Sequence, residues 1–465
     1  MDNALEARTK ATGNRAQGLL LFGISLGYFM VLLDTTIISV ALPAIRADLG
    51  GGISGLQWIV NAYTIVFAGL LLSMGSIADK LGARRVYIGG AALFLVASAL
   101  SAAVSSLGAL IALRIVLGAG GAALLPASLT LIAHAFPDPK ERARALGIWA
   151  AFTGMALAAG PVVGGILVDS VGWRSIFLLN VPLALISLTT TLLFTKRERP
   201  QSRQHLDLNG QVLAIAAIVA LSFGLMKGGS YGWSSAVIVT VFGVALASAV
   251  LFVIVERRGK SPLLPLQLFR NPAVSAGMIA GMIMNLGLSG ILFVLPLFFQ
   301  QLRGLSAYSA GLALLPMMIP MVVNPIWVGR IVPRVGARTF TTIGFGLGAL
   351  GTWMLVGVDV HTSDLRTILG LLLFGFGVTF TIPPLVTAVV SSVPKELTGA
   401  ASGALNASRQ LGATLGVAVL GAIIDGSGSF VSGMHAALML TTIILLGGSL
   451  LSFFFMGSSK KGKAV

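Results

Sequence analysis

The sequence of 465 residues contains no cysteine and few charged residues. Without cysteine the chain has no disulfide bond, no thiol nucleophile and no thiolate metal site. Charged residues make up only 10% of the chain, whereas they account for ~25% of an average soluble domain. Hydrophobic residues make up 56%, and the mean hydropathy is +0.95. The composition therefore excludes a soluble globular protein and indicates a chain that crosses a membrane many times.

Several functional signals are absent as well. The four histidines have no metal-ligand spacing, and no G-x-x-x-x-G-K nucleotide loop is present. Apolar segments and short links take up almost the whole chain, which leaves no room for a soluble catalytic domain. We therefore expect no enzyme activity, no cofactor and no metal, and an ion gradient rather than ATP as the energy source. A membrane sensor or scaffold would need a partner-binding domain or a long loop, and the sequence has neither.

Long apolar runs dominate what is present. A run of ~20 apolar residues is long enough to cross a bilayer as a helix. The runs bounded by Gly, Pro and charged residues predict fourteen spans, at residues 18–44, 54–75, 85–105, 107–134, 143–168, 174–195, 209–228, 234–255, 273–300, 308–332, 339–358, 365–391, 401–425 and 433–456. An even number of spans places both termini on the same side of the membrane.

Basic residues outnumber acidic ones by 31 to 15, and the net charge is +16. Most lysines and arginines fall on the side of the two termini, and those on the opposite side are only Arg46, Arg174, Lys227, Arg303 and Arg366. This placement follows the positive-inside rule and suits anionic lipid headgroups rather than nucleic acid. We predict a multi-pass protein of the bacterial cytoplasmic membrane, with the lipid bilayer as its partner and both termini in the cytoplasm.

Two similar stretches indicate an internal duplication. Residues 75–84 (GSIADKLGAR), after the second span, resemble residues 329–338 (GRIVPRVGAR), after the tenth. The two stretches occupy equivalent places if spans seven and eight are an insertion between two six-helix bundles. The sequence therefore predicts an all-α membrane protein with an N-terminal bundle over 1–200, two extra helices over 201–262 and a C-terminal bundle over 263–465.

Asp34 is the candidate functional residue with the clearest physical argument. It lies inside the first apolar run, and every other run lacks an acid near its middle. A charge at that depth costs about 2.5–3.5 kcal/mol on insertion scales, so an acid there is expected to face a cavity or a partner. Burial raises the pKa of a carboxyl group, so Asp34 is a candidate proton carrier.

Two motifs carry a family resemblance. Residues 75–85 (GSIADKLGARR) resemble the signature loop of the major facilitator superfamily, G-x-x-x-D-[KR]-x-G-[RK]-[RK]. Residues 33–43 (LDTTIISVALP) resemble the first-span motif of the fourteen-span drug:proton antiporters of that superfamily, and residues 57–63 (QWIVNAY) and 172–182 (GWRSIFLLNVP) agree with it. The resemblance implies the major facilitator fold, a monomer that works by alternating access, and exchange of a small lipophilic molecule for protons.

The resemblance also implies roles for single residues. Arg114 matches the fourth-span motif and is expected to sense the charge of Asp34, directly or through water. Residues 154–165 (GMALAAGPVVGG) are similar to the antiporter motif, whose small residues let helices slide past each other. The residues expected to control conformational gating are Gly75, Asp79, Gly82, Arg84, Arg85, Gly160, Pro161, Gly164 and Gly165.

The substrate is expected between the two bundles. Arg409 lies near the cytoplasmic end of its span and is assigned a structural role. The candidate substrate-binding residues are Asp34, Tyr63, Trp149, Asn285, Phe293, Met317, Phe376, Asn406 and Gln410. A lipophilic cation and a proton would compete for the single negative charge of Asp34. We therefore expect export of monocationic or neutral drugs or dyes by proton antiport. Export of one specific natural product or metabolite, or proton-coupled import, stays open as an alternative.

Overall fold

The computed structural model of the chain describes residues 2–195, 207–259, 264–394 and 397–456, and within these ranges every regular element is a helix. Thirteen of the described helices are long and apolar enough to cross a membrane, and a bent pair brings the total to fourteen if it counts as one span. This confirms the predicted all-α membrane architecture.

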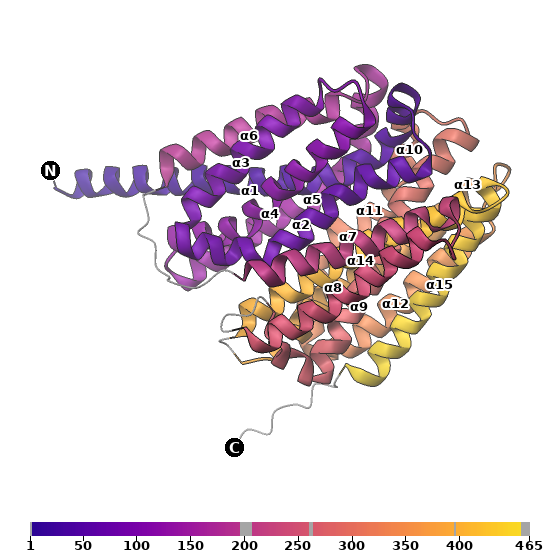
Figure 1. Cartoon of the computed structure of the whole chain (residues 1–465). Helices are drawn as coiled ribbons and strands as arrows, with labels where there is room; N and C mark the ends of the chain where they lie inside the picture. Colours follow the sequence, from indigo (N-terminus) through magenta and orange to yellow (C-terminus); the bar gives the residue numbers. More distant parts are fainter. Residues whose placement is uncertain (1, 196–206, 260–263, 395–396, 457–465) are drawn as a thin grey trace.

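The N-terminal group of helices is formed by α1 to α6, which pack against one another (Figure 1). Their bounds are α1 (Asp2–Leu49), α2 (Ile53–Leu81), α3 (Ala83–Ser101), α4 (Leu107–Ala135), α5 (Pro139–Ser170) and α6 (Ser175–Phe194).

The C-terminal group of helices is formed by α9 to α15 and two short helices. Their bounds are η1 (Leu266–Arg270), α9 (Pro272–Leu297), η2 (Phe298–Leu302), α10 (Ala307–Ala313), α11 (Leu315–Val335), α12 (Ala337–Val356), α13 (Asp364–Ser391), α14 (Thr398–Asp425) and α15 (Phe430–Phe455). Both groups make the turn at the repeated loop with a left-handed glycine, Gly82 at φ 91° and Gly336 at φ 94°, a conformation in which a side chain is strained.

The tenth span differs from the expected continuous helix over 308–332. It is broken into α10 and α11, whose axes differ by 47°. Pro316 lies in the first turn of α11. Because proline has no N–H and its ring clashes with the carbonyl four residues earlier, it ends the preceding helix. The break leaves α10 as a separate seven-residue helix that contacts α5 of the N-terminal group.

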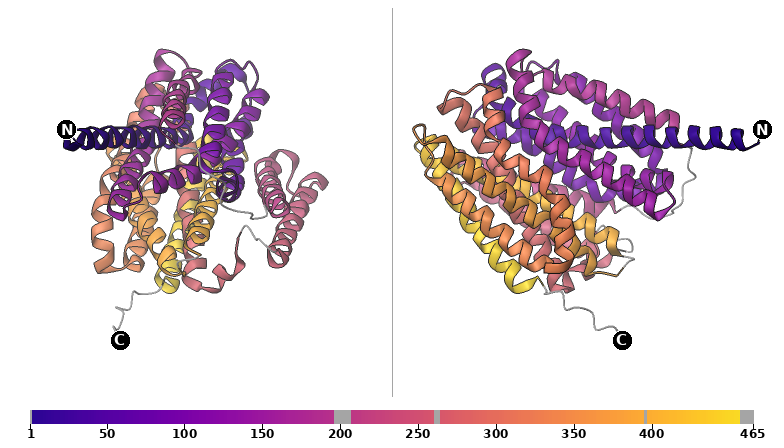
Figure 2. Two further views of the ribbon diagram at one scale, coloured as in Figure 1. Left: turned by 90° about the vertical axis from the view of Figure 1, so that its left-hand side faces the viewer. Right: turned by 180° about the vertical axis from the view of Figure 1, so that it is seen from behind.

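The pair α7 (Leu208–Tyr231) and α8 (Ala236–Arg258) lies beside the two groups, as Figure 2 shows in its left view. α7 contacts α2 and α14, one helix from each group. Gln211 of α7 hydrogen-bonds the Ser73 hydroxyl and the Gly69 carbonyl of α2. The side chain of Asn61 on α2 reaches the sulfur of Met226 on α7 at 3.5 Å. Polar contacts therefore fix the extra pair to the N-terminal group.

The two groups meet at one end of the molecule and diverge toward the end where α1 begins and α15 ends (Figure 2, right). We call these ends the far side and the terminal side. In the part of the chain that the structure describes, every hydrogen bond between the two groups lies in the far half of the helices. The conformation is therefore closed on the far side.

Candidate functional site

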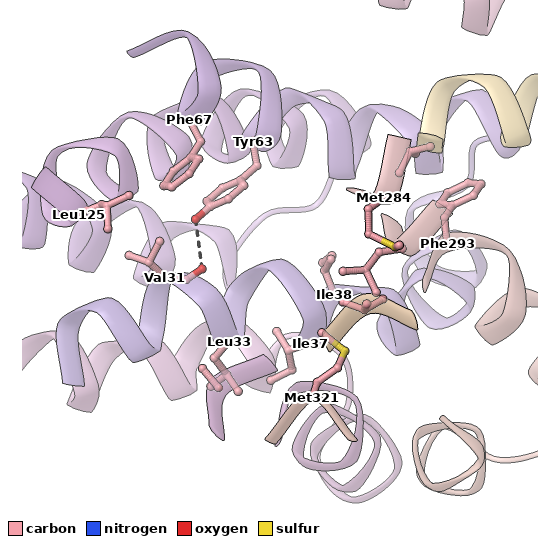
Figure 3. Close-up of a cluster of buried hydrophobic side chains, with 14 of the residues drawn as sticks. Val31, Leu33, Ile37, Ile38, Tyr63, Phe67, Leu125, Met284, Phe293 and Met321 are labelled. Atoms are coloured by element: carbon pink, nitrogen blue, oxygen red, sulfur yellow. Dashed lines mark hydrogen bonds between the residues drawn. The ribbon is translucent and has the colours of Figure 1, made fainter. Parts of the chain in front are cut away.

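A cavity of about 200 Å³ lies between the two groups, on the terminal side of this closure. Figure 3 shows buried apolar side chains of both groups, with Ile38 of α1 near Phe293 and Met321 of the C-terminal group, and Tyr63 and Phe67 of α2 beside Val31 and Leu125. The cavity is lined by Tyr28, Leu32, Thr35, Thr36, Ile38, Ser39, Leu42, Val60, Tyr63, Thr64, Phe67, Leu71, Leu125, Thr153, Leu157, Asn285, Leu288, Ser289, Leu292, Phe293, Met321, Ile382, Asn406, Arg409, Gln410 and Ala413.

Five of the predicted substrate-binding residues lie on this wall: Tyr63, Asn285, Phe293, Asn406 and Gln410. They come from α2, α9 and α14, so the cavity brings together residues that are more than 300 positions apart in the sequence. Asn406 and Gln410 share one face of α14, as their spacing of one helical turn predicts.

Four other predicted residues do not line the cavity. Met317 is fully buried against α13, where a β-carbon on Gly375 would overlap its carbonyl oxygen. Phe376 packs edge-on against Phe380, with ring centroids 5.9 Å apart. Trp149 lies one layer behind the wall and stacks on Tyr28 at 4.7 Å. Asp34, the fourth, is also behind the wall.

Asp34 is held in a buried cluster within the N-terminal group. Its carboxylate forms an ion pair with Arg114 of α4, and both side chains are almost completely buried. The Asn180 amide of α6 donates to the other carboxylate oxygen at 3.1 Å. Arg114 also donates through Nε to the Ile59 carbonyl of α2 at 2.9 Å. One acid therefore ties together α1, α2, α4 and α6.

Tyr63 separates this cluster from the cavity. Its ring lines the cavity, and the Arg114 guanidinium lies 4.4 Å from the ring centroid in a cation–π contact. Its hydroxyl donates to the Val31 carbonyl of α1 at 3.2 Å, the dashed line in Figure 3. Asp34 is therefore not exposed to the cavity, but its partner Arg114 contacts Tyr63, which lines the cavity.

Arg409 is the charged residue whose position differs most from the sequence-based expectation. It lies on the cavity wall. Among the described residues, its hydrogen-bond partner is the Asn406 side-chain oxygen at 3.3 Å, and its buried Nε has no partner. Its stem packs on α9, where a β-carbon on Gly281 would lie 3.0 Å from the Arg409 Cγ. The structural role assigned from the sequence does not account for this unfilled donor.

The far-side closure uses the glycines of the predicted antiporter motif. A β-carbon on Gly160 would overlap Thr36 of α1, and one on Gly164 would lie 2.7 Å from Ile37. One on Gly165 would lie 2.5 Å from the Ala307 carbonyl oxygen of α10. The glycines of α5 therefore allow a close approach to α1 on one face of the helix and to α10 of the C-terminal group on another.

Contacts from α10 complete this interface. Gly311 faces the Pro161 carbonyl so closely that a β-carbon there would overlap it. The Asp169 carboxylate at the end of α5 accepts hydrogen bonds from the first backbone N–H groups of α10, Ala307 at 3.1 Å and Tyr308 at 2.8 Å. An acid at this position satisfies N–H groups that a helix start leaves free.

Two glutamines add cross-group hydrogen bonds. Gln57 of α2 donates to the Val417 and Ala418 carbonyls of α14, both at 2.9 Å. Gln300 of η2 donates to the Val40 carbonyl of α1 at 2.9 Å. Sequence reasoning missed both glutamines, Asp169 and Asn180, although residues 57–63 and 172–182 contain two of them.

The predicted gating loop at 75–85 lies on the terminal side. Arg84 donates to the Thr195 hydroxyl at 2.7 Å and to the Leu192 carbonyl at 3.0 Å, which ties the start of α3 to the end of α6. Asp79 and Arg85 are exposed, and a β-carbon on Gly75 would meet only Pro126, at 3.9 Å. In this conformation the loop contacts its own group.

No group of three or more metal-ligating side chains is found among the described residues. The arrangement has two charged features: a neutralised ion pair behind the cavity wall and a single cation on the wall. The ion pair connects helices of one group, and breaking it would leave a buried charge without its counterion.

Comparisons with known proteins agree with the fold. The model of the Major Facilitator Superfamily matches residues 24–417. The chain is 35% identical over 440 residues to the methylenomycin A resistance protein of Bacillus subtilis, covering 94% of this chain and 93% of that protein. It is 36% identical over 411 residues to the multidrug resistance protein Stp of Mycobacterium tuberculosis, covering 88% and 76%. The crystal structure of a D-xylose-proton symporter superposes with a TM-score of 0.71 at 15% identity, covering 95% of this chain and 98% of that one.

Proposed function

The chain belongs to the major facilitator superfamily, and we propose that it is a proton-coupled antiporter of the fourteen-span type that exports lipophilic small molecules. The observation that carries the proposal is the buried ion pair between Asp34 and Arg114, one side chain away from a cavity that lies between two groups of helices. The names of the relatives, an antibiotic resistance protein and a multidrug resistance protein, support export as the direction.

Proton binding acts on α1 in this proposal. Protonation of Asp34 removes the negative charge that holds Arg114, so the guanidinium keeps the Ile59 carbonyl and its place over Tyr63 but loses its counterion. Losing one partner of a buried pair costs about 3–5 kcal/mol, which favours rearrangement of the helices around it.

α1 connects this event to the closure on the far side. Thr36 and Ile37, close to Asp34, pack against glycines of α5, and the Val40 carbonyl accepts the hydrogen bond from Gln300 of the other group. A shift of α1 relative to α4 therefore disturbs the far-side contacts. Rocking of the N-terminal group (1–200) against the C-terminal group (263–465) then opens the cavity alternately to each side, with 201–262 as an accessory pair.

The proton gradient supplies enough energy for this cycle. One proton that moves down a potential of ~100 mV releases about 2.3 kcal/mol. This corresponds to a concentration ratio of about fiftyfold for a neutral cargo exchanged one for one. The direction requires that the terminal side faces the cytoplasm, as the distribution of basic residues predicts.

Export of one specific natural product is the second candidate. It is favoured by the name of the Bacillus subtilis relative, which refers to one antibiotic. Export of monocations stays a prediction from the sequence; it relied on Asp34 as a negative site for cargo, and in the described conformation Asp34 is bound by Arg114 and Asn180 behind the wall. Neutral cargo fits the mostly apolar wall.

Proteoliposomes with an imposed pH gradient test the proposal. The purified protein and its Asp34→Asn variant are compared with a panel of neutral, anionic and cationic dansyl dyes. We expect the wild type to move at least one dye against its gradient and the variant to lose at least ~99% of that gradient-driven rate. Equal gradient-driven rates in the two proteins would rule out a coupling role for Asp34. Asp48→Asn, which breaks a half-exposed ion pair with Arg174, is the matched control and should transport normally.

A further inference from the structure

We propose that the cavity binds organic anions, and that the Arg409 guanidinium pairs with the acidic group of the cargo. This assignment rests on the proposed transport function and specifies its substrate class. The starting point is the charge of the wall. Among the residues that line the cavity, Arg409 is the one charged side chain, and the other polar residues are neutral hydroxyls and amides.

The guanidinium of Arg409 has unused hydrogen-bonding capacity. Arginine carries five N–H donors and stays protonated. In the described part of the chain one donor reaches the Asn406 oxygen at 3.3 Å, and no carboxylate forms an ion pair with Arg409. Arginine within a membrane protein is expected to pair or to face a water-filled cavity. A planar guanidinium with free donors matches a carboxylate or sulfonate, which accepts two parallel hydrogen bonds.

The position of the guanidinium is fixed by its surroundings. Its stem rests on Gly281, whose missing side chain leaves the space that Arg409 Cγ fills at the edge of α9. Asn406, one turn earlier on α14, holds one of its terminal nitrogens. These contacts hold the guanidinium at the cavity wall.

The rest of the wall fits the body of an amphiphilic molecule. Leu288, Leu292 and Phe293 of α9 and Ile38 and Leu42 of α1 line the same cavity. The Asn285 amide already donates to the Gly281 carbonyl at 3.0 Å, which leaves its oxygen as an acceptor. An apolar or aromatic body therefore contacts the aliphatic side chains, while its acidic end reaches Arg409.

A cationic cargo is disfavoured by the same geometry. The nearest acid, Asp34, is bound by Arg114 and Asn180 and is nearly fully buried behind Tyr63. A cation in the cavity would meet the charge of Arg409 without a counterion, and like charges repel strongly at low dielectric. The cavity therefore discriminates by charge sign, in addition to apolar fit.

Equilibrium binding with three matched dyes tests the assignment. The probes are dansylglycine (a carboxylate), dansylamide (neutral) and a dansyl derivative with a trimethylammonium group, titrated by fluorescence against the detergent-purified protein. We expect the wild type to bind dansylglycine at least tenfold more tightly than the other two. Arg409→Gln should weaken dansylglycine binding at least tenfold and leave dansylamide binding within about twofold. Arg409→Lys keeps the charge but not the paired N–H donors, so it should weaken dansylglycine binding less than Arg409→Gln does.

Controls separate a charge effect from misfolding. Arg366→Gln removes an arginine at the far side, where its Nε donates to the Met354 carbonyl, and should leave all three affinities unchanged. The assignment is overturned if the wild type binds dansylglycine no more tightly than dansylamide. It is also overturned if Arg409→Gln and Arg409→Lys weaken all three dyes equally, because that pattern shows a structural role.

The proposed function and this assignment can fail separately. If proteoliposomes move the neutral or cationic dye under a pH gradient and the carboxylate binds no better, transport stands and the anion site is wrong. If dansylglycine binds through Arg409 but no dye moves under any gradient, the anion site stands and the transport proposal is wrong.

Discussion

Arg114 of α4 and Arg409 of α14 have opposite surroundings. Arg114 is 1% exposed, pairs with Asp34, donates to a backbone carbonyl and stacks on Tyr63. Arg409 lines the cavity and has one amide oxygen as its hydrogen-bond partner among the described residues. The difference indicates a division of labour. In the proposed scheme, the charge with a complete set of partners is the switch inside one group of helices, and the charge with free donors is the binding site between the groups.

This division also separates coupling from recognition. In the simplest antiport scheme the proton and the cargo compete for one acid. Here the acid lies behind the wall, and the charge on the wall has the opposite sign. We therefore propose that proton and cargo act on different residues, Asp34 and Arg409, and are linked through α1 and the contacts between the two groups.

The largest expected difference between the two arginines is in stability. Arg114→Gln leaves the buried Asp34 without its counterion, and we expect it to lower the free energy of unfolding by about 3–5 kcal/mol. Arg409→Gln removes a charge that has no counterion in the described residues, and we expect a change of less than about 1 kcal/mol. Denaturation of both variants in detergent at pH 7.5 measures this. Equal losses would show that the two arginines do not differ in the way proposed.

A double variant sharpens the same comparison. Asp34→Asn combined with Arg114→Gln replaces the ion pair by two neutral amides of similar shape. We expect it to regain at least half of the stability that Arg114→Gln loses, because no unpaired charge stays buried. Gradient-driven transport should remain absent, since the proposed proton carrier has been replaced by an amide that does not titrate. Recovery of gradient-driven transport in this double variant would exclude the ion pair from coupling.

The far-side closure should respond to steric change. Gly311→Val places a side chain against the Pro161 carbonyl, so we expect the population to shift toward conformations open on the far side. Because the chain has no cysteine, spin labels on introduced cysteines report distances without background. The pair Val171→Cys and Leu365→Cys on the far side should lengthen, and the pair Leu81→Cys and Val335→Cys on the terminal side should shorten.

Gly447→Val is the control for this steric change. A β-carbon at that position meets no heavy atom within 4 Å, so both label distances should stay as in the parent protein. Unchanged distances in Gly311→Val would contradict the role given to the contact between α5 and α10.

A smaller shift is expected from the hydrogen bonds between the groups. Gln57→Ala removes the donors to the Val417 and Ala418 carbonyls, worth about 1 kcal/mol in total, so the far-open population should rise by about fivefold. The same spin-label pairs measure this change. Gln17→Ala removes a glutamine-to-carbonyl hydrogen bond within one group, to Ala135, and should leave the distances unaltered. Equal effects of the two variants would show that Gln57 does not hold the closure.

Much of the fold could be predicted because the length of an apolar run and the spacing of glycines can be read from the sequence alone. The spans follow from the length of the apolar runs, and the close contacts of Gly160 and Gly164 follow from their spacing. The break before α11 could not be placed, since the tenth span contains three prolines, Pro316, Pro320 and Pro325, and tertiary contacts decide which one ends a helix.

The lining of the cavity was harder to predict than the spans. Lipid and protein core are both apolar, so the face that a membrane helix turns to a cavity leaves little periodic signal. Met317 and Phe376 were therefore placed on the wall, although both pack inside the C-terminal group. Asn180 and Arg409 could be recognised as site residues only from the structure, which shows the partners of Asp34 and the unfilled donors of the Arg409 guanidinium.

The most direct measurement compares a variant of each site in two assays, binding and transport, in the same proteoliposomes. Dansylglycine affinity and gradient-driven transport of dansylamide are measured for Asp34→Asn and for Arg409→Gln. We predict that Asp34→Asn binds dansylglycine at least as tightly as the wild type but loses coupling, and that Arg409→Gln loses the anion affinity but still couples transport of the neutral dye. If Asp34→Asn abolishes dansylglycine binding, or if Arg409→Gln leaves it intact, coupling and recognition are not divided between these two residues.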